Sequence, residues 1–141
     1  MKRGEKVKLT KNFSTKELEC ECGCGFGSKR EDYDPRLLTM LQKVRDKWGK
    51  PIYDWQLSCC RCPTHNIEVG GVPGSKHAKN PCEACDIAFN RDERDDFIEM
   101  VLQMHENGEL DELGGIGYQR YTNGCVHLDT YHADDGHLRR W

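Results

Sequence analysis

Apolar residues recur every three or four positions in two stretches of the chain, and this spacing predicts two amphipathic helices. The first covers residues 35–48, where Asp34 caps the start ahead of a proline and Gly49 ends the helix. The second covers residues 90–106 and closes near Gly108. The apolar faces are predicted to consist of Leu37, Leu41, Val44 and Trp48 in the first helix, and of Phe97, Val101, Leu102 and Met104 in the second.

Shorter patterns predict one more helix and a strand in the first half of the chain. Ser14 and Glu17 have the spacing of a capping box, which predicts a short helix that ends near Cys20. Apolar and polar residues alternate over residues 52–58, so we expect a strand there. One face of this strand would hold Tyr53, Trp55 and Leu57.

The second half of the chain predicts three more strands. An uninterrupted apolar run indicates a buried strand at residues 84–89. Two further strands, at residues 115–120 and 125–130, flank Asn123-Gly124, which is a strong hairpin signal. Residues 59–79 are rich in glycine and are predicted to be mostly loop. This order of elements predicts an α+β fold, with helices packed on one side of a small antiparallel sheet.

Length and composition indicate one soluble globular domain. Of 141 residues, 36% are hydrophobic and 32% are charged, and no apolar run is long enough to cross a bilayer. We predict a basic tail at residues 1–12 and a single, monomeric domain at residues 13–141. The net charge of −3 gives no support for a nucleic-acid partner. No apolar segment follows the basic N-terminus, so we expect no secretory signal and synthesis in the cytoplasm.

His77 and Asp86 are the first candidates for metal ligands. His77 lies in a glycine-rich loop, and Asp86 lies nine residues later on a predicted strand with apolar neighbours. A carboxylate in such surroundings needs a strong partner, because burying a bare charge is costly. A metal ion is one such partner, and an arginine or a helix N-terminus is the alternative.

His127 and Asp129 form the second half of the candidate site. They lie two positions apart on a predicted strand, so their side chains point to the same face, while Val126 and Leu128 point to the core. A sheet can display a functional site in this way, although an ion pair on a half-exposed strand has the same pattern.

His77, Asp86 and His127 together offer two nitrogen donors and one oxygen donor. Catalytic zinc typically has three protein ligands and keeps a fourth position for water. Zinc activates such a water molecule for attack on an amide carbonyl, and a nearby carboxylate is needed to take up the proton. Asp129 lies on the correct face for this general-base role, or it orients one of the zinc ligands instead.

Further motifs accompany these residues in a fixed order. They are Gly70-Gly71-Val72-Pro73-Gly74-Ser75-Lys76-His77, Ala84-Cys85-Asp86-Ile87, Gly115-Ile116-Gly117-Tyr118 and Val126-His127-Leu128-Asp129-Thr130. They closely resemble the zinc D-alanyl-D-alanine carboxypeptidase family, and in particular its phage endolysin and small murein-peptidase branch. Residues 13–25 are similar to the family's N-terminal helix and cysteine-glycine loop, and residues 58–66 are similar to its arginine loop. The resemblance extends to Trp141 and covers nearly the whole chain after residue 12.

The resemblance implies a zinc peptidase with a fold like that of hedgehog proteins and D-Ala-D-Ala peptidases. It implies that His77, Asp86 and His127 bind the zinc, and that the enzyme hydrolyses amide bonds in peptidoglycan stem peptides as a carboxypeptidase or an endopeptidase. Arg61 and Ser75 are then expected at the substrate, with Arg61 meeting a peptide carboxylate through its planar pair of donors. The alternatives are a surface ion pair for Arg61 and a structural loop hydroxyl for Ser75. Action at the cell wall after phage-type release would fit the lack of a secretory signal.

Two departures from the family pattern affect the expected mechanism. The family has six residues between its first histidine and the aspartate, and this chain has eight, with the extra length around Cys82. The loop beside the metal is therefore remodelled, which bears on specificity more than on zinc binding. No glutamate or aspartate stands a few residues before His127, where some relatives have their general base, and Asp129 is left as the candidate base.

Nine cysteines are unusually many, and the odd number excludes complete pairing within one chain. Their tight clustering suits a second, structural zinc site, and disulfides or buried thiols are the alternatives. The cysteines available for such a site or for disulfides are Cys20, Cys22, Cys24, Cys60, Cys62, Cys82 and Cys85. Cys59 and Cys125 are predicted to be single buried thiols.

Two other functions remain open at this point. One is a catalytically silent zinc module that binds cell-wall peptide or a protein partner. The other is a cysteine-rich protein whose zinc is purely structural. A usable base beside the metal and an open fourth position would distinguish the peptidase from both.

Overall fold

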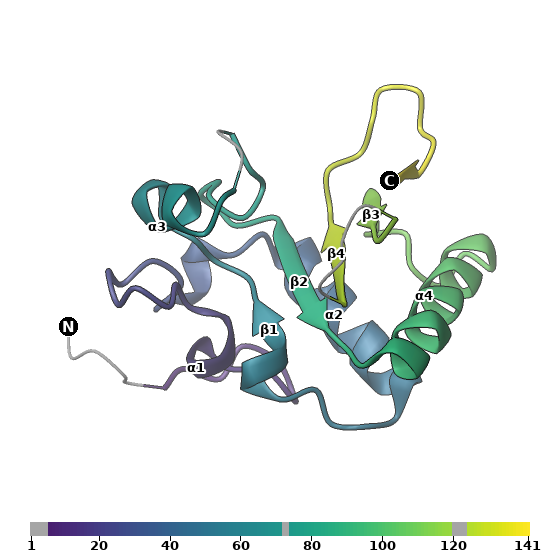
Figure 1. The fold of residues 1–141 in the computed structure, drawn as a ribbon, viewed down its shortest axis with the longest axis horizontal. Helices are drawn as coiled ribbons and strands as arrows, with labels where there is room; N and C mark the ends of the chain where they lie inside the picture. The colour runs from purple at the N-terminus through teal and green to yellow at the C-terminus, as the bar shows by residue number, and fades with distance from the viewer. Residues whose placement is uncertain (1–5, 72–73, 120–123) are drawn as a thin grey trace.

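A five-stranded sheet forms the centre of the fold (Figure 1). The computed structural model describes residues 6–71, 74–119 and 124–141. Within these residues the strand order is β1-β2-β4-β3-β5, and all neighbours are antiparallel except β3 and β5, which are parallel. The strands are β1 (Leu57–Ser58), β2 (Ala84–Ala88), β3 (Gly115–Gly117), β4 (Cys125–Asp129) and β5 (Arg139–Arg140). The predicted α+β class with a small, mainly antiparallel sheet is confirmed.

Four α-helices accompany the sheet in the part of the chain that the structure describes. They are α1 (Thr15–Leu18), α2 (Pro35–Trp48), α3 (Pro63–Glu68) and α4 (Arg91–Glu106). Two short 3-10 helices, η1 (Arg30–Asp32) and η2 (Asp54–Gln56), complete the secondary structure. None of the helices described has the length and apolar character that a bilayer crossing requires.

The predicted start and stop signals of the helices are confirmed. The Asp34 side chain accepts a hydrogen bond from the backbone N–H of Arg36 at 3.0 Å, and Gly49 ends α2 in the left-handed conformation with φ of 71°. At α1, the Glu17 carboxylate accepts from the backbone N–H of Ser14 at 2.8 Å, as expected for a capping box. Asn90 caps α4 through a bond from the N–H of Glu93.

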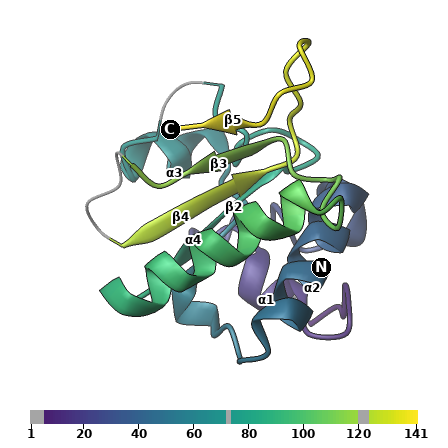
Figure 2. The same ribbon diagram turned by 90° about the vertical axis from the view of Figure 1, so that its right-hand side faces the viewer.

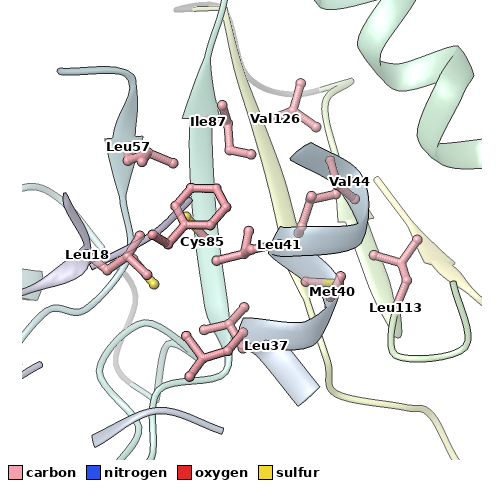
Figure 3. Packing of buried hydrophobic residues seen from close by; sticks show 14 of the residues in the cluster. Leu18, Leu37, Met40, Leu41, Val44, Leu57, Cys85, Ile87, Leu113 and Val126 are labelled. Carbon is pink, nitrogen blue, oxygen red and sulfur yellow. The ribbon is translucent and has the colours of Figure 1, made fainter. Parts of the chain in front are cut away.

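The core lies between the sheet and the long helices α2 and α4. Cys85 and Ile87 of β2 and Val126 of β4 point toward Leu41 and Val44 of α2 (Figure 3). Figure 2 shows α4 running beside β4. Because successive side chains of a strand alternate between faces, the opposite face of β2 and β4 is left for polar residues.

The strand predicted at residues 52–58 is largely wrong. Only its last two residues are a strand, and Asp54–Gln56 form the 3-10 helix η2. Gln56 stabilises this turn, since its side-chain oxygen accepts from the N–H of Tyr53 at 3.0 Å and its amide donates to the carbonyl of Ala88 at 2.9 Å. Tyr53 and Trp55 are 53% and 75% exposed and stack on each other outside the core. Alternation of apolar residues could not separate a strand from a surface turn with aromatic side chains.

Helix α3 was not expected in the segment interpreted as mostly loop. Cys62 is its N-cap and accepts from the N–H of His65 at 3.4 Å, and Pro63 occupies the first helical position. The proline was a usable start signal. The six residues of the helix are too few to show an apolar period, which explains why the pattern failed here.

The N-terminal residues that the structure describes lie against the domain. Leu9 is buried, Lys8 pairs with Ser14 in an isolated bridge, and the N–H of Val7 donates to the Thr15 hydroxyl at 3.0 Å. The first five residues of the predicted tail lie outside the described residues. The same holds for Val72-Pro73 in the glycine loop, for Arg120 at the end of one predicted strand, and for Asn123 of the hairpin signal.

Candidate metal centre

The polar face of the sheet brings Asp86 and His127 together. Asp86 of β2 pairs directly with His127 of β4, so both side chains leave the sheet on the same side. Their neighbours on this face are Ser58 of β1, which pairs with Asp86, and Gly117 of β3, which pairs with His127. The predicted alternation along residues 125–130 is therefore confirmed, with Val126 and Leu128 buried on the other face.

His77 reaches the same point from the loop between α3 and β2. The loop is held by backbone hydrogen bonds, because the carbonyl of His77 accepts from the N–H of Arg61 at 2.9 Å. The N–H of His77 in turn donates to the hydroxyl of Ser75 at 3.2 Å. The imidazole Nδ1 donates to the carbonyl of Cys59 at 2.7 Å, so Nε2 points to the sheet.

Three donor atoms converge where these side chains meet. His77 Nε2 lies 3.1 Å from Asp86 Oδ1 and 3.3 Å from His127 Nδ1, and the latter two atoms are 2.9 Å apart. Ligands about 2.0–2.1 Å from a tetrahedral zinc ion lie about 3.3 Å from one another. The three residues, which we call the His-Asp-His site, therefore have the donor types and spacing that zinc binding requires.

The outer nitrogen of each histidine has a fixed acceptor. His77 uses the carbonyl of Cys59, and His127 Nε2–H donates to Asp129 Oδ2 at 2.8 Å. Such contacts fix the ring orientation and leave the inner nitrogen with a free electron pair, which is the usual arrangement around metal-bound histidines. The donor set therefore fits zinc both in its ligands and in the groups that orient them.

Asp129 has both carboxylate oxygens occupied and is only 1% exposed. Oδ2 accepts from His127, while Oδ1 accepts from the guanidinium of Arg139 and from the N–H of Tyr131, the latter at 3.1 Å. Gly115 of β3 lies directly beside the ion pair of Asp129 and Arg139. A Cβ atom at this position would come within 2.5 Å of the Arg139 guanidinium and 2.9 Å of Asp129 Oδ1. The glycine thus leaves the space that the ion pair fills.

The electrostatics of the site are dominated by a row of groups with alternating charge, namely Asp86, His127, Asp129 and Arg139. Burial alone would raise the pKa of Asp86, but the hydrogen bonds with His127 and His77 outweigh it and hold the pKa well below its usual range. Burial would lower the pKa of His127, yet the hydrogen bonds with Asp129 and Asp86 raise it to about 9. Burial likewise opposes ionisation of Asp129, and the contact with His127 lowers its pKa nevertheless. The two carboxylates on either side of His127 therefore both favour the charged form of its imidazole.

Arg61 lies on the wall of the site with a side chain that is 13% exposed. Its Nη2 donates to Asp86 Oδ2 at 2.8 Å and to the Ser58 hydroxyl at 3.3 Å. The guanidinium thereby holds the second oxygen of Asp86, while the first oxygen faces the histidines. The sequence alternatives for Arg61 were a substrate carboxylate or a surface ion pair, and the observed pair is with the candidate metal ligand.

A cavity of about 530 Å³ opens over the His-Asp-His site. Its wall includes Ser75 and three cationic side chains, those of Arg61, Lys76 and Arg139. Trp141 closes one side, with its ring 5.2 Å from that of His127. This excess of positive charge suits a substrate that carries carboxylates.

Sequence reasoning had no signal for Arg139 or for the carbonyl of Cys59. Arg139 reaches Asp129 only because β5 returns along β3 after a long irregular segment. The contact of Cys59 comes from its backbone, which is the same in every residue type. Tyr118, a further motif residue, points away from the site, since its hydroxyl accepts from Arg140 at 3.1 Å and its carbonyl accepts from Arg94.

Seven of the nine cysteines fall into two groups, and no disulfide joins any of the nine. The first group holds Cys20, Cys22, Cys24 and Cys62, and the second holds Cys59, Cys60 and Cys82. The prediction that Cys59 is a single thiol is therefore wrong, because its sulfur lies 3.8 Å from that of Cys82. Cys85 is buried in the core beside α2, and Cys125 is half-buried on β4.

Comparison with known proteins gives one match. The model of a family described as Peptidase M15 matches residues 11–129. The match spans α1 to the end of β4 and includes the three residues of the His-Asp-His site together with Arg61 and Asp129. No curated protein matches the chain, and no solved structure matches it.

Proposed function

The chain belongs to the Peptidase M15 family, and we propose that it is a zinc metallopeptidase that hydrolyses amide bonds in peptidoglycan stem peptides. The family consists of zinc-dependent peptidases related to D-Ala-D-Ala carboxypeptidases. The observation that carries the proposal is the convergence of three zinc-type donor atoms at the base of a cationic cavity.

The His-Asp-His site would hold the zinc ion in this proposal. When bound, zinc supplies Lewis-acid polarisation of the scissile carbonyl and activation of water. The chain itself supplies the orientation of the ligands, because Cys59 and Asp129 fix the two imidazoles and Arg61 fixes the carboxylate. We assign Asp129 to this orienting role, since a carboxylate with both oxygens engaged and 1% exposure has poor access to a substrate proton.

The cavity wall supports a substrate with a free carboxylate, as stem peptides have. Arg61 uses Nε and Nη2 for its bonds to Ser58 and Asp86, and we assign its Nη1 to the substrate carboxylate. Lys76 and Arg139 contribute further positive charge along the same wall. Ser75 offers a hydroxyl to the substrate backbone and is itself placed by the N–H of His77.

A catalytically silent zinc module remains the second candidate, and one observation favours it. Among the described residues that line the cavity, the carboxylates are Asp86 and Asp129, and both are already engaged. A peptidase needs a group that accepts the proton of the attacking water. A module that only binds cell-wall peptide needs none.

Digestion of purified peptidoglycan followed by mass spectrometry separates the two candidates. We expect the wild-type chain to release peptides, and we expect chelator or the His127→Ala variant to abolish release, with zinc restoring only the wild type. Loss of one terminal residue would identify a carboxypeptidase, and separated stem fragments an endopeptidase. Intact muropeptides with fully zinc-loaded protein would refute the hydrolase and leave the binding module.

A further inference from the structure

Four cysteine side chains meet at the start of α3. Cys20, Cys22 and Cys24 belong to the loop after α1, and Cys62 is the N-cap of α3, about forty positions later. All four sulfur atoms lie within 4.8 Å of one another. We call this group the four-cysteine cluster.

The sulfur distances distinguish a metal site from disulfides. The Sγ atoms of Cys20 and Cys22 are 3.4 Å apart, and those of Cys22 and Cys62 are 3.6 Å apart. Four thiolates about 2.3 Å from a tetrahedral zinc ion lie about 3.8 Å from one another. A disulfide requires about 2.05 Å instead. The observed separations are therefore close to those of a zinc–thiolate site.

The backbone around the cluster is built to hold sulfur atoms inward. Gly23 and Gly25 have φ of 80° and 96°, and these left-handed turns let alternate cysteines of one short loop face a common point. The N–H of Cys62 donates to the sulfur of Cys20, and the N–H of His65 donates to the sulfur of Cys62, both at 3.4 Å. Backbone donors of this kind stabilise negatively charged sulfur.

We propose that the four-cysteine cluster binds a structural zinc ion at a site separate from the His-Asp-His site. Four thiolates form a closed tetrahedral shell, as in structural zinc sites, whereas the His-Asp-His site has three ligands. The ion joins the loop after α1 to the start of α3 across about forty residues. Each of these segments is short, and the metal would add to the hydrogen bond from Cys62 to Cys20 that already joins them.

This position links the structural ion to the substrate cavity. Cys62 directly follows Arg61, whose N–H donates to the carbonyl of His77 at 2.9 Å and whose guanidinium holds Asp86. On the N-terminal side of Arg61, the N–H of Cys60 donates to the carbonyl of Leu18 at 3.0 Å. Fixing the position of Cys62 therefore also fixes the backbone from which the Arg61 side chain extends.

The second cysteine group provides a contrast within the same molecule. Cys59, Cys60 and Cys82 are fully buried and offer three sulfur atoms. The thiols of Cys59 and Cys82 both donate to the carbonyl of Ala84, at 3.3 and 3.4 Å. Structural zinc sites have four protein ligands, and among the described residues this group offers three. We therefore assign no metal to this group.

Zinc content per chain tests the proposal. In protein purified under reducing conditions without chelator, elemental mass spectrometry should give two zinc ions for the wild type. The Cys22→Ser/Cys24→Ser variant should retain one, and the control Cys125→Ser should retain two. A cysteine variant with the wild-type zinc content would overturn the proposal. The His77→Ala/His127→Ala variant should also retain one, and its zinc loss reports separately on the His-Asp-His site.

A second measurement covers the case in which the cysteine variant does not fold. X-ray absorption at the zinc edge of the His77→Ala/His127→Ala protein examines the remaining ion directly. We expect a shell of four sulfur atoms at about 2.3 Å. A shell of nitrogen and oxygen alone, or protein without zinc, would refute the structural site and leave the peptidase proposal untouched.

Discussion

Replacing Asp129 by asparagine separates an orienting carboxylate from a general base. Asp129 accepts hydrogen bonds at both oxygens, from His127 on one side and from Arg139 and Tyr131 on the other. An asparagine amide has only one acceptor oxygen, so its NH2 group must face N–H donors on one of the two sides. The variant also removes the negative charge that increases the basicity of His127.

The expected loss follows from these contacts. Removing an outer partner of a metal-bound histidine typically lowers metal affinity by about 10–100-fold, which is about 1.4–2.8 kcal/mol. We therefore expect Asp129→Asn to bind zinc at the His-Asp-His site 10–100-fold more weakly. At saturating zinc, the rate of peptide release should recover most of the wild-type value.

Competition with a chromogenic chelator measures the zinc affinity, and hydrolysis at saturating zinc measures kcat. Asp134→Asn is the matched control, because Asp134 is an exposed carboxylate in the same C-terminal segment and should change neither quantity. A variant that binds zinc like the wild type but hydrolyses about 10²–10⁴-fold more slowly would refute the orienting role and restore Asp129 as the base.

Three further predictions concern the same site. Zinc binding by the His-Asp-His site should strengthen about tenfold per pH unit up to pH 9, because His127, with its pKa raised to about 9, must lose a proton to bind the metal. Chelator competition from pH 7 to 9 measures this affinity, and a constant affinity would contradict the prediction. Gly115→Ala should displace the Arg139 guanidinium and lower the free energy of unfolding by about 1–3 kcal/mol, as measured by urea denaturation. An unchanged urea midpoint would show that Arg139 moves aside without loss of stability. Arg61→Lys keeps the charge but loses the planar fork, so KM measured at saturating zinc should rise about tenfold, and an unchanged KM would remove Arg61 from the substrate.

The sequence predicted those parts of the fold that local signals determine. Residues 34–49 contain a cap, a proline, an apolar period and a terminal glycine, and all four signals agree with α2 as observed. Asp86 and His127 were placed on strands with the correct faces, because residues of a half-buried strand face the core and the polar side in turn, and the sequence alternates accordingly. The donor types of His77, Asp86 and His127 suggested a zinc set, and the family resemblance supported their grouping, because no local pattern shows that His77 lies beside the two strands.

The contacts that sequence reasoning missed depend on tertiary structure. The interaction of Arg139 with Asp129 requires the parallel pairing of β5 with β3, and no periodicity records such a return of the chain. Trp55 was misplaced because a surface turn and a short strand can share one apolar pattern. The division of the cysteines into two groups was likewise inaccessible, since spacing along the chain does not show that Cys62 turns outward while its neighbour Cys60 turns inward.

The direct pairing of Asp86 with His127 has a consequence for how related chains can diverge. The register of two adjacent strands sets the distance between these ligands, so the 40 residues between them can lengthen or shorten without moving either donor. An insertion of one residue inside β2 or β4 would instead turn a ligand into the core. Insertions in the connecting loops can therefore change specificity while the ligands stay in place, whereas insertions within the five residues of β2 or of β4 would remove a ligand from the site.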